Sequence, residues 1–111
     1  MEQISWSDFE KVELRIGTIL SVEDFPKAKK PSLQLTIDFG ELGIKKSSAQ
    51  ITVHYTKEEL VGRQIMAVLN FPVKQIANFF SECLTTGVTD EAGNIVLMSP
   101  DKPVPNGAKL L

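Results

Sequence analysis

The sequence predicts an all-β protein (mainly β with short helices), and three observations lead to this class. Apolar and polar residues alternate in several segments with the period of two that is typical of half-buried strands. Turn signals rich in glycine, proline and asparagine separate these segments at short intervals. The clearest helical signals are two capping boxes, and each is followed by only a few residues of helical pattern.

The N-terminal segment predicts a short helix over residues 7–13. Ser7 is the expected N-cap, because an acidic residue three positions later completes a capping box and suits the helix dipole. Trp6, just before this cap, is expected to pack back onto the helix. A long strand follows from Leu14 to Val22, and Gly17 within it suggests a bulge or a sharp bend.

The middle of the chain alternates between strands and connections. Residues 25–32, with two prolines and three lysines, are expected to form an exposed loop after the first strand. A glycine-rich turn is expected at residues 40–43, and a second capping box at Thr56 predicts a helical turn. Three further strands are predicted in this part of the chain, over residues 33–39, 44–53 and 64–69.

The C-terminal part begins with residues 70–80, which are expected to be irregular. It then contains two strand-like segments on either side of Asp90–Asn94, a pattern typical of a β-hairpin. The two strands are predicted at residues 83–89 and 95–98. A polar loop is expected at residues 100–107, and residues 109–111 form a last short strand or a tail.

The order of these elements favours a barrel. Three strands, a small helix, a fourth strand and further strands within about 110 residues favour a small Greek-key barrel, for which the five-stranded OB-fold is the leading candidate. The alternation by itself also fits a small sandwich. We interpret residues 1–111 as one domain, because the chain has the commonest domain length.

The charges are distributed unevenly along the chain. Lysine and arginine number 12 against 14 acidic residues, so the net charge of -2 excludes a histone-like polycation. Residues 25–74, however, carry eight basic and four acidic residues, whereas the segments before and after are acidic. The total charge therefore conceals a basic middle.

Chemistry that needs a catalytic or metal site has little support in the sequence. The chain has one cysteine, Cys83, and one histidine, His54, and neither lies in a known catalytic signature. Cys83 is expected to be a buried, unreactive residue. We therefore predict no enzyme activity, no metal and no cofactor. No apolar run approaches the roughly 20 residues needed to span a bilayer, so we expect a cytoplasmic protein without membrane insertion.

Lysines gather in the loops that an OB barrel presents to oligonucleotides. If these loops meet at one end of the barrel, their lysines would form a positive groove for phosphates. The alternative is that they only solubilise the surface. The candidate RNA-binding lysines are Lys27, Lys29, Lys30, Lys45, Lys46 and Lys74.

Phe79 and Phe80 are adjacent, so in a strand they point to opposite faces. We expect one of them in the core and the other at an interface with a peptide or a second subunit. Stacking of the exposed ring on a base is a further possibility, and the alternative is that both rings are buried where the chain bends.

Five segments follow one another at a characteristic spacing, namely residues 9–17, 33–40, 54–63, 68–71 and 81–84. Together they resemble the tRNA-binding domain found in the C-terminal part of some methionyl-tRNA synthetases. The resemblance implies an OB-fold homodimer that binds tRNA. The lysines would contact its phosphates, and hydrogen bonds to the RNA would come from Gln50, Asn78 and Ser81. Residues 46–51 and 70–77 are similar to a subgroup of free-standing bacterial protein-export chaperones, which implies a role in holding unfolded preproteins for the export machinery.

The sequence departs from residues common in the tRNA-binding relatives at four positions: Gln50, Asn78, Cys83 and Leu84. Where such relatives have glycine, their backbone can approach the RNA closely, and in this protein a side chain occupies that space. The function expected is a non-catalytic tRNA-binding module that also acts as a secretion chaperone, and the alternative is a tRNA-binding protein with no peptide role. The candidate residues for peptide binding or a dimer interface are Trp6, Phe9, Ile76, Phe79, Phe80 and Leu84.

Overall fold

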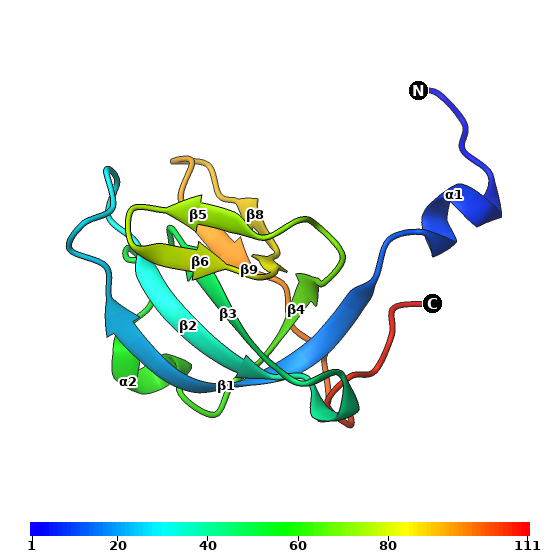
Figure 1. Cartoon of the computed structure of the whole chain (residues 1–111). Coiled ribbons are helices and arrows are strands. Elements are labelled where there is room, and N and C mark those ends of the chain that lie inside the picture. Colours follow the sequence, from blue (N-terminus) through cyan, green and yellow to red (C-terminus); the bar gives the residue numbers. More distant parts are fainter.

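A five-stranded antiparallel sheet that curls into a nearly closed barrel forms the centre of the computed structural model, which describes residues 1–111 (Figure 1). The strand order is β3-β2-β1-β4-β7. These strands are β1 (Leu14–Asp24), β2 (Leu33–Asp38), β3 (Ile44–Ala49), β4 (Gln64–Val68) and β7 (Leu84–Thr85). A short helix, α2 (Lys57–Leu60), lies between β3 and β4 in the chain, as expected for the OB-fold.

The two edge strands, β3 and β7, approach each other and close the barrel. Thr85 Oγ1 donates a hydrogen bond of 2.8 Å to Ser47 Oγ on β3. Just before β7, the Glu82 amide donates to the Lys46 carbonyl at 2.7 Å. The barrel prediction is therefore confirmed, and the sandwich alternative is wrong.

The strand β1 is long because it serves two neighbours. Its first part, from Leu14 to Thr18, pairs with β4, and its second part pairs with β2. The sequence suggested a bulge or bend at Gly17. The register with β2 instead shifts between Ile19 and Ser21, so the bulge lies further along the strand. Gly17 has another role, because a Cβ there would lie 2.7 Å from the ring of Phe39.

The third strand is shorter than predicted. It ends at Ala49, because the chain then turns toward α2, whose N-cap Thr56 forms the predicted capping box with Glu59. The predicted turn before it is a short 3-10 helix, η1 (Gly40–Leu42). The last residues form neither a full strand nor a free tail, since Lys109 makes a single β-bridge with Arg15.

Two small hairpins follow β4. The first, β5 (Lys74–Ile76) and β6 (Phe79–Ser81), lies in the region predicted to be irregular. That prediction was wrong because the turn has no glycine: Ala77 itself adopts a positive φ of 54°. The second hairpin, β8 (Gly87–Thr89) and β9 (Ile95–Leu97), is the predicted one, but Thr86 separates β8 from β7.

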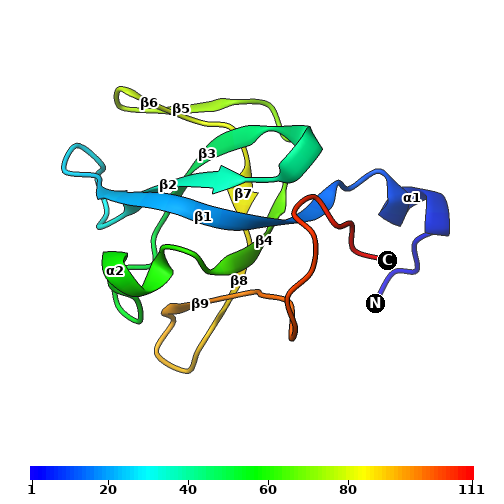
Figure 2. The same ribbon diagram turned by 90° about the horizontal axis from the view of Figure 1, so that it is seen from below.

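The N-terminal helix starts earlier than predicted and is shorter. It is α1 (Trp6–Glu10), and its N-cap is Ser5, which forms a capping box with Asp8. Two overlapping Ser-x-x-acid patterns are present in the sequence, and the structure uses the first. No residue of α1 is buried, and the helix stands off the barrel beside the C-terminus (Figures 1 and 2).

The hydrophobic core fills the barrel. It is built from the inward-facing residues of β1 to β4, and its largest fully buried side chain is Phe39. Leu60 of α2 and Leu97 of β9 join this core, so the helix and the second hairpin cover its open ends. No helix of the protein is long and apolar enough to cross a membrane.

Candidate functional site

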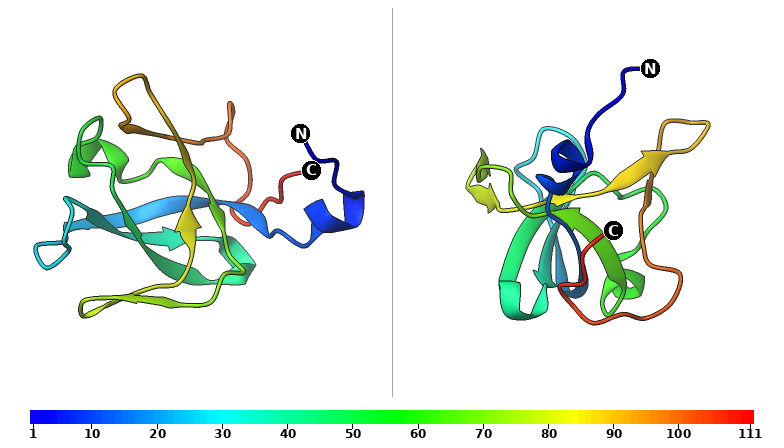
Figure 3. Two further views of the ribbon diagram at one scale, coloured as in Figure 1. Left: turned by 90° about the horizontal axis from the view of Figure 1, so that it is seen from above. Right: turned by 90° about the vertical axis from the view of Figure 1, so that its right-hand side faces the viewer.

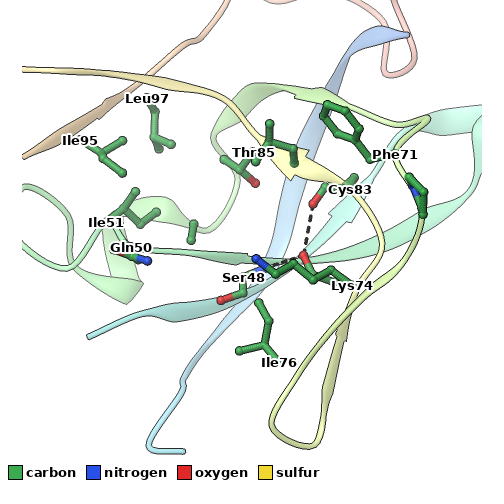
Figure 4. Close-up of a pocket in the computed structure, with 14 residues that line it drawn as sticks. Ser48, Gln50, Ile51, Phe71, Lys74, Ile76, Cys83, Thr85, Ile95 and Leu97 are labelled. Carbon is green, nitrogen blue, oxygen red and sulfur yellow. Dashed lines mark hydrogen bonds between the residues drawn. The ribbon is translucent and has the colours of Figure 1, made fainter. Parts of the chain in front are cut away.

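A groove lies between the end of β3 and the two hairpins, with a volume of about 450 Å³ (Figure 4). Its apolar wall is formed by Ile51, Phe71, Ile76, Leu84, Ile95 and Leu97. Its polar side chains are Ser48, Gln50, Lys74, Ser81 and Thr85. No aspartate or glutamate lines it, so Lys74 is its only charged group.

The register of the first hairpin explains which of its side chains face the groove. Lys74 pairs with Ser81 and Ile76 pairs with Phe79, while Gln75 and Phe80 form the pair between them. Successive residues of a strand point to opposite faces. Lys74, Ile76 and Ser81 therefore line the groove, whereas Phe80 lies on the outer face of the hairpin with its side chain 55% exposed.

Phe79 lies on the barrel side of the hairpin and is buried against Phe25, with their ring centroids 5.4 Å apart. This contact ties the hairpin to the β1–β2 loop, which begins at Phe25. The structure thus has one phenylalanine in the core and one exposed, and neither lines the groove.

Hydrogen bonds to the backbone hold one side of the groove in place. The Ser81 hydroxyl donates to the Cys83 carbonyl at 3.3 Å and accepts from the Ser48 amide at 3.2 Å. Its proton is therefore used within the protein, and Ser81 can only accept a further bond. Gln50 is exposed and its side-chain amide makes no hydrogen bond within the protein, so it is free to bind a ligand.

Cys83 lies at the buried side of the groove, and its Sγ donates a weak hydrogen bond to the Lys46 carbonyl at 3.8 Å. Burial raises the pKa of its thiol to about 11, so the sulfur is neutral at pH 7 and a poor nucleophile. His54 does not assist it, because His54 Nε2 lies 2.6 Å from Asp90 Oδ2. No three residues of the metal-binding types cluster anywhere in the protein.

The six candidate lysines do not gather at one point. Lys27, Lys29 and Lys30 are exposed in the β1–β2 loop, beside the tip of the first hairpin (Figures 1 and 2). Lys45 and Lys46 lie at the other end of β3, where they pair with the last residues of β2. Lys74 begins β5 and pairs with Ser81, at the end of the hairpin away from its tip, and it lines the groove. The candidate lysines are therefore divided between the β1–β2 loop, the groove and a pair further along β3.

None of these six lysines forms an ion pair. Acidic side chains pair instead with other basic groups: Glu13 contacts Arg15 at 2.7 Å and Lys109 at 3.1 Å, and Asp24 contacts Lys57 at 3.0 Å. The positive charge of the candidate lysines is thus not neutralised by neighbouring carboxylates within 4.0 Å.

The remaining predicted residues lie outside the groove. Asn78 is at the exposed tip of the first hairpin. Trp6 and Phe9 lie on α1, with their rings 5.3 Å apart, at the end of the barrel opposite the β1–β2 loop (Figure 3). Much of the apolar wall, including Phe71, was not predicted from the sequence. The signal for Phe71 was an aromatic residue directly before a proline in a segment between strands, where a side chain is often exposed.

Residues 14–109 match the family model described as "Putative tRNA binding domain". The chain belongs to this family. The matched range covers the barrel and both hairpins of the tRNA-binding domain and begins after α1. The family resemblance of the sequence is confirmed.

Curated relatives include methionine–tRNA ligases much longer than this domain. Those of Methanocaldococcus jannaschii and Methanococcus aeolicus are 34% and 36% identical over 99% of the chain. The chain spans only 17% and 16% of the lengths of these two relatives. The domain is thus similar to one part of each ligase.

Solved structures match the domain over its whole length. The chaperone CsaA from Bacillus anthracis has a TM-score of 0.92 and 49% identity, covering 99% of this chain and all of that one. The CsaA chaperone from Picrophilus torridus has a TM-score of 0.90 and 47% identity, covering 98% and 100%. The MetRS related protein from Pyrococcus horikoshii is 25% identical with a TM-score of 0.87, and each chain is fully covered.

Proposed function

We propose that the protein is a non-catalytic, cytoplasmic tRNA-binding module whose RNA-binding face joins the groove to the lysines of the β1–β2 loop. The observation that carries this proposal is the charge pattern of the face. Lys74 is the groove's only charged side chain, and the lysines of the β1–β2 loop lack acidic partners. Membership of the tRNA-binding domain family supports it. Such a face favours phosphates and offers apolar surface to unstacked bases.

The test is the salt dependence of tRNA binding. Each phosphate contact that is lost reduces the slope of log affinity against log salt by about one. We therefore expect the combined variant Lys29→Ala, Lys30→Ala, Lys74→Ala to bind tRNA more weakly and with a shallower slope, measured by fluorescence anisotropy. Lys102→Ala, an exposed lysine outside this face, is the control. Equal affinity of the triple variant and the parent at every salt concentration would refute the site.

A second function, the holding of unfolded preproteins for export, is favoured by the apolar wall of the groove. We infer that apolar segments of an unfolded chain bind there, since burial of apolar side chains is the main driving force available to such a ligand. The likeness to CsaA chaperones supports this role. Phe71, which is 56% exposed at the wall, is well placed for the contact.

The chaperone role is tested by suppression of aggregation of a non-native protein. Phe71→Ser is expected to lose most of the suppression because it removes apolar contact area from the groove. Phe80→Ser is a matched control, since Phe80 is 55% exposed on the outer face of the hairpin. If the parent does not suppress aggregation, the alternative of a tRNA-binding protein without a peptide role stands.

We also propose that the protein is a homodimer. The support is α1, which carries Trp6 at 65% exposure, buries nothing on its own barrel and yet packs Trp6 against Phe9. An apolar recess of about 510 Å³ that includes Met66, Met98 and Leu110 offers further surface for a second copy. Apolar surface of this kind is typical of subunit interfaces.

A further inference from the structure

We propose that tRNA and unfolded polypeptide compete for the one groove, so that binding of either ligand releases the other. This inference rests on the proposed function and goes beyond it, because two activities on one small protein do not by themselves require a shared site. It concerns how the two ligands regulate each other's binding.

The candidate residues for RNA and those for a peptide interleave along the groove. Lys74 and Ile76 project from the same face of β5 and are two positions apart. Ser81 pairs with Lys74, and Leu84, three residues after Ser81, also lines the groove. Polar groups suited to RNA and apolar groups suited to a peptide therefore share one surface, and neither set forms a separate site.

The groove is small. The volume of about 450 Å³ lies in the lower part of the range of roughly 300–1,000 Å³ for pockets that hold one small ligand. It accommodates one nucleotide or a short apolar stretch of a polypeptide. Because both ligands are long chains that continue beyond the groove, a bound chain also covers the rim formed by Phe71 and Leu84.

The same wall of the groove can serve either ligand. A base has an apolar face that packs on Phe71 or Ile76, while its phosphate lies near Lys74. An apolar side chain packs on the same two residues. No carboxylate lines the groove, so no negative charge repels the phosphate. Lys74 is exposed, so its ammonium group can stay in water when an apolar peptide is bound and the cost of burying a charge is avoided.

The consequence is a quantitative linkage. With one shared site, the apparent Kd of tRNA rises in proportion to one plus the peptide concentration divided by the peptide Kd. The effect is reciprocal, because each ligand must change the affinity of the other by the same factor.

The experiment measures the anisotropy of dye-labelled tRNA at fixed salt while an apolar peptide without charged residues is added. An uncharged peptide is required, because an acidic one would displace RNA from the lysines without entering the groove. We expect the apparent Kd of tRNA to rise linearly with peptide and without a plateau. A plateau, or no change at peptide concentrations that saturate the protein, overturns the shared site while leaving both proposed functions intact.

The variant Leu84→Glu distinguishes one shared site for tRNA and peptide from two adjacent sites. Leu84 is 48% exposed, so the variant is expected to fold, and it places a carboxylate in the groove. Both affinities should fall about tenfold or more, since the charge repels phosphate and is costly to bury under an apolar group. Val88→Glu, at a 55% exposed position outside the groove, is the matched control and should change neither.

The outcomes distinguish the inference from the functions on which it rests. Loss of only one affinity in Leu84→Glu means separate sites and overturns the inference alone. Failure of the parent to bind either tRNA or peptide overturns the corresponding proposed function, and the competition falls with it.

Discussion

At the scale of single residues, Gly17 shows how tightly the barrel is packed. It is buried in β1, and a Cβ in its place would lie 2.7 Å from Ile37 Cγ2 and 2.7 Å from the Phe39 ring. Phe39 is fully buried, so its ring has no open space into which it can move. Glycine is required here for the close approach of β2 and not for an unusual backbone angle, since its φ is not positive.

We expect Gly17→Ala to lower the free energy of unfolding by about 1–3 kcal/mol, the usual effect of overpacking a core. The measurement is the midpoint of urea unfolding, with the slope of the transition unchanged. Ser21→Ala, at an exposed position of the same strand, is the control. An unchanged midpoint in Gly17→Ala would mean that β2 shifts to accommodate the methyl group.

At the scale of elements, the β8–β9 hairpin depends on contacts outside itself. Its strands have three residues each, and isolated two-stranded hairpins are marginally stable in water. Two contacts anchor it to the connection between β3 and α2. The Leu97 amide donates to the Tyr55 hydroxyl at 2.9 Å, and Asp90 bonds His54 at 2.6 Å. Because Ile95 and Leu97 form part of the groove wall, these anchors also shape the candidate site.

The Asp90 anchor predicts an acid-sensitive contribution to stability. The Asn94 backbone amide, followed by His54, holds the pKa of the Asp90 carboxyl below its ordinary value of 3.8. A group whose pKa is lowered by folding stabilises the fold above its ordinary pKa and loses this effect as the pH falls through the lowered value. Urea unfolding should therefore show a smaller loss of stability below pH 3.8 in Asp90→Asn than in the parent.

The control for this prediction is Asp101→Asn, at an exposed position without an ion pair. It should retain the acid dependence of the parent. If Asp90→Asn also retains it in full, the carboxylate does not contribute to the anchoring of the hairpin.

At the scale of the whole molecule, local ion pairs sharpen the uneven distribution of charge. Three acidic residues of the N-terminal third form ion pairs with basic groups, among them Asp8 with Lys11 and Asp24 with Lys57. The six candidate lysines have no such partners. A net charge of -2 therefore coexists with a basic face, and binding of RNA is expected to be confined to that face.

The arrangement of the termini leads to a prediction on the oligomeric state. The helix α1 and the C-terminus lie together at the end of the barrel away from the β1–β2 loop, so they offer one surface for a second copy (Figure 3). We expect the parent to have twice the monomer mass of 12.3 kDa in light scattering, and Trp6→Glu to shift toward the monomer. Val53→Glu changes an equally exposed position, 65%, outside this surface and should stay dimeric. A monomeric parent would refute the homodimer.

Much of the fold was predictable because its signals are local. The alternation in β1, β2 and β4 and the capping box at Thr56 place these elements within a few residues of their observed bounds. Local signals failed where two of them overlapped, as in the capping patterns that start at Ser5 and Ser7. They also failed where a tertiary contact, and not a local turn signal, stabilises the element. The first hairpin belongs to the latter kind, because Phe79 is buried against Phe25 and the turn at Ala77 has no glycine.

The sequence by itself determined the main barrel strands β1, β2 and β4, the basic middle, the absence of a multi-cysteine site and the family. Only the tertiary structure decided which candidate residues meet. Gln50, Lys74 and Leu84 come from three different segments, and the closure of β3 against β7 brings them to one groove. The same closure leaves Lys45, Lys46 and Phe80 outside it. The physical reason is that alternation assigns a side chain to a face, whereas long-range strand pairing decides which faces lie together.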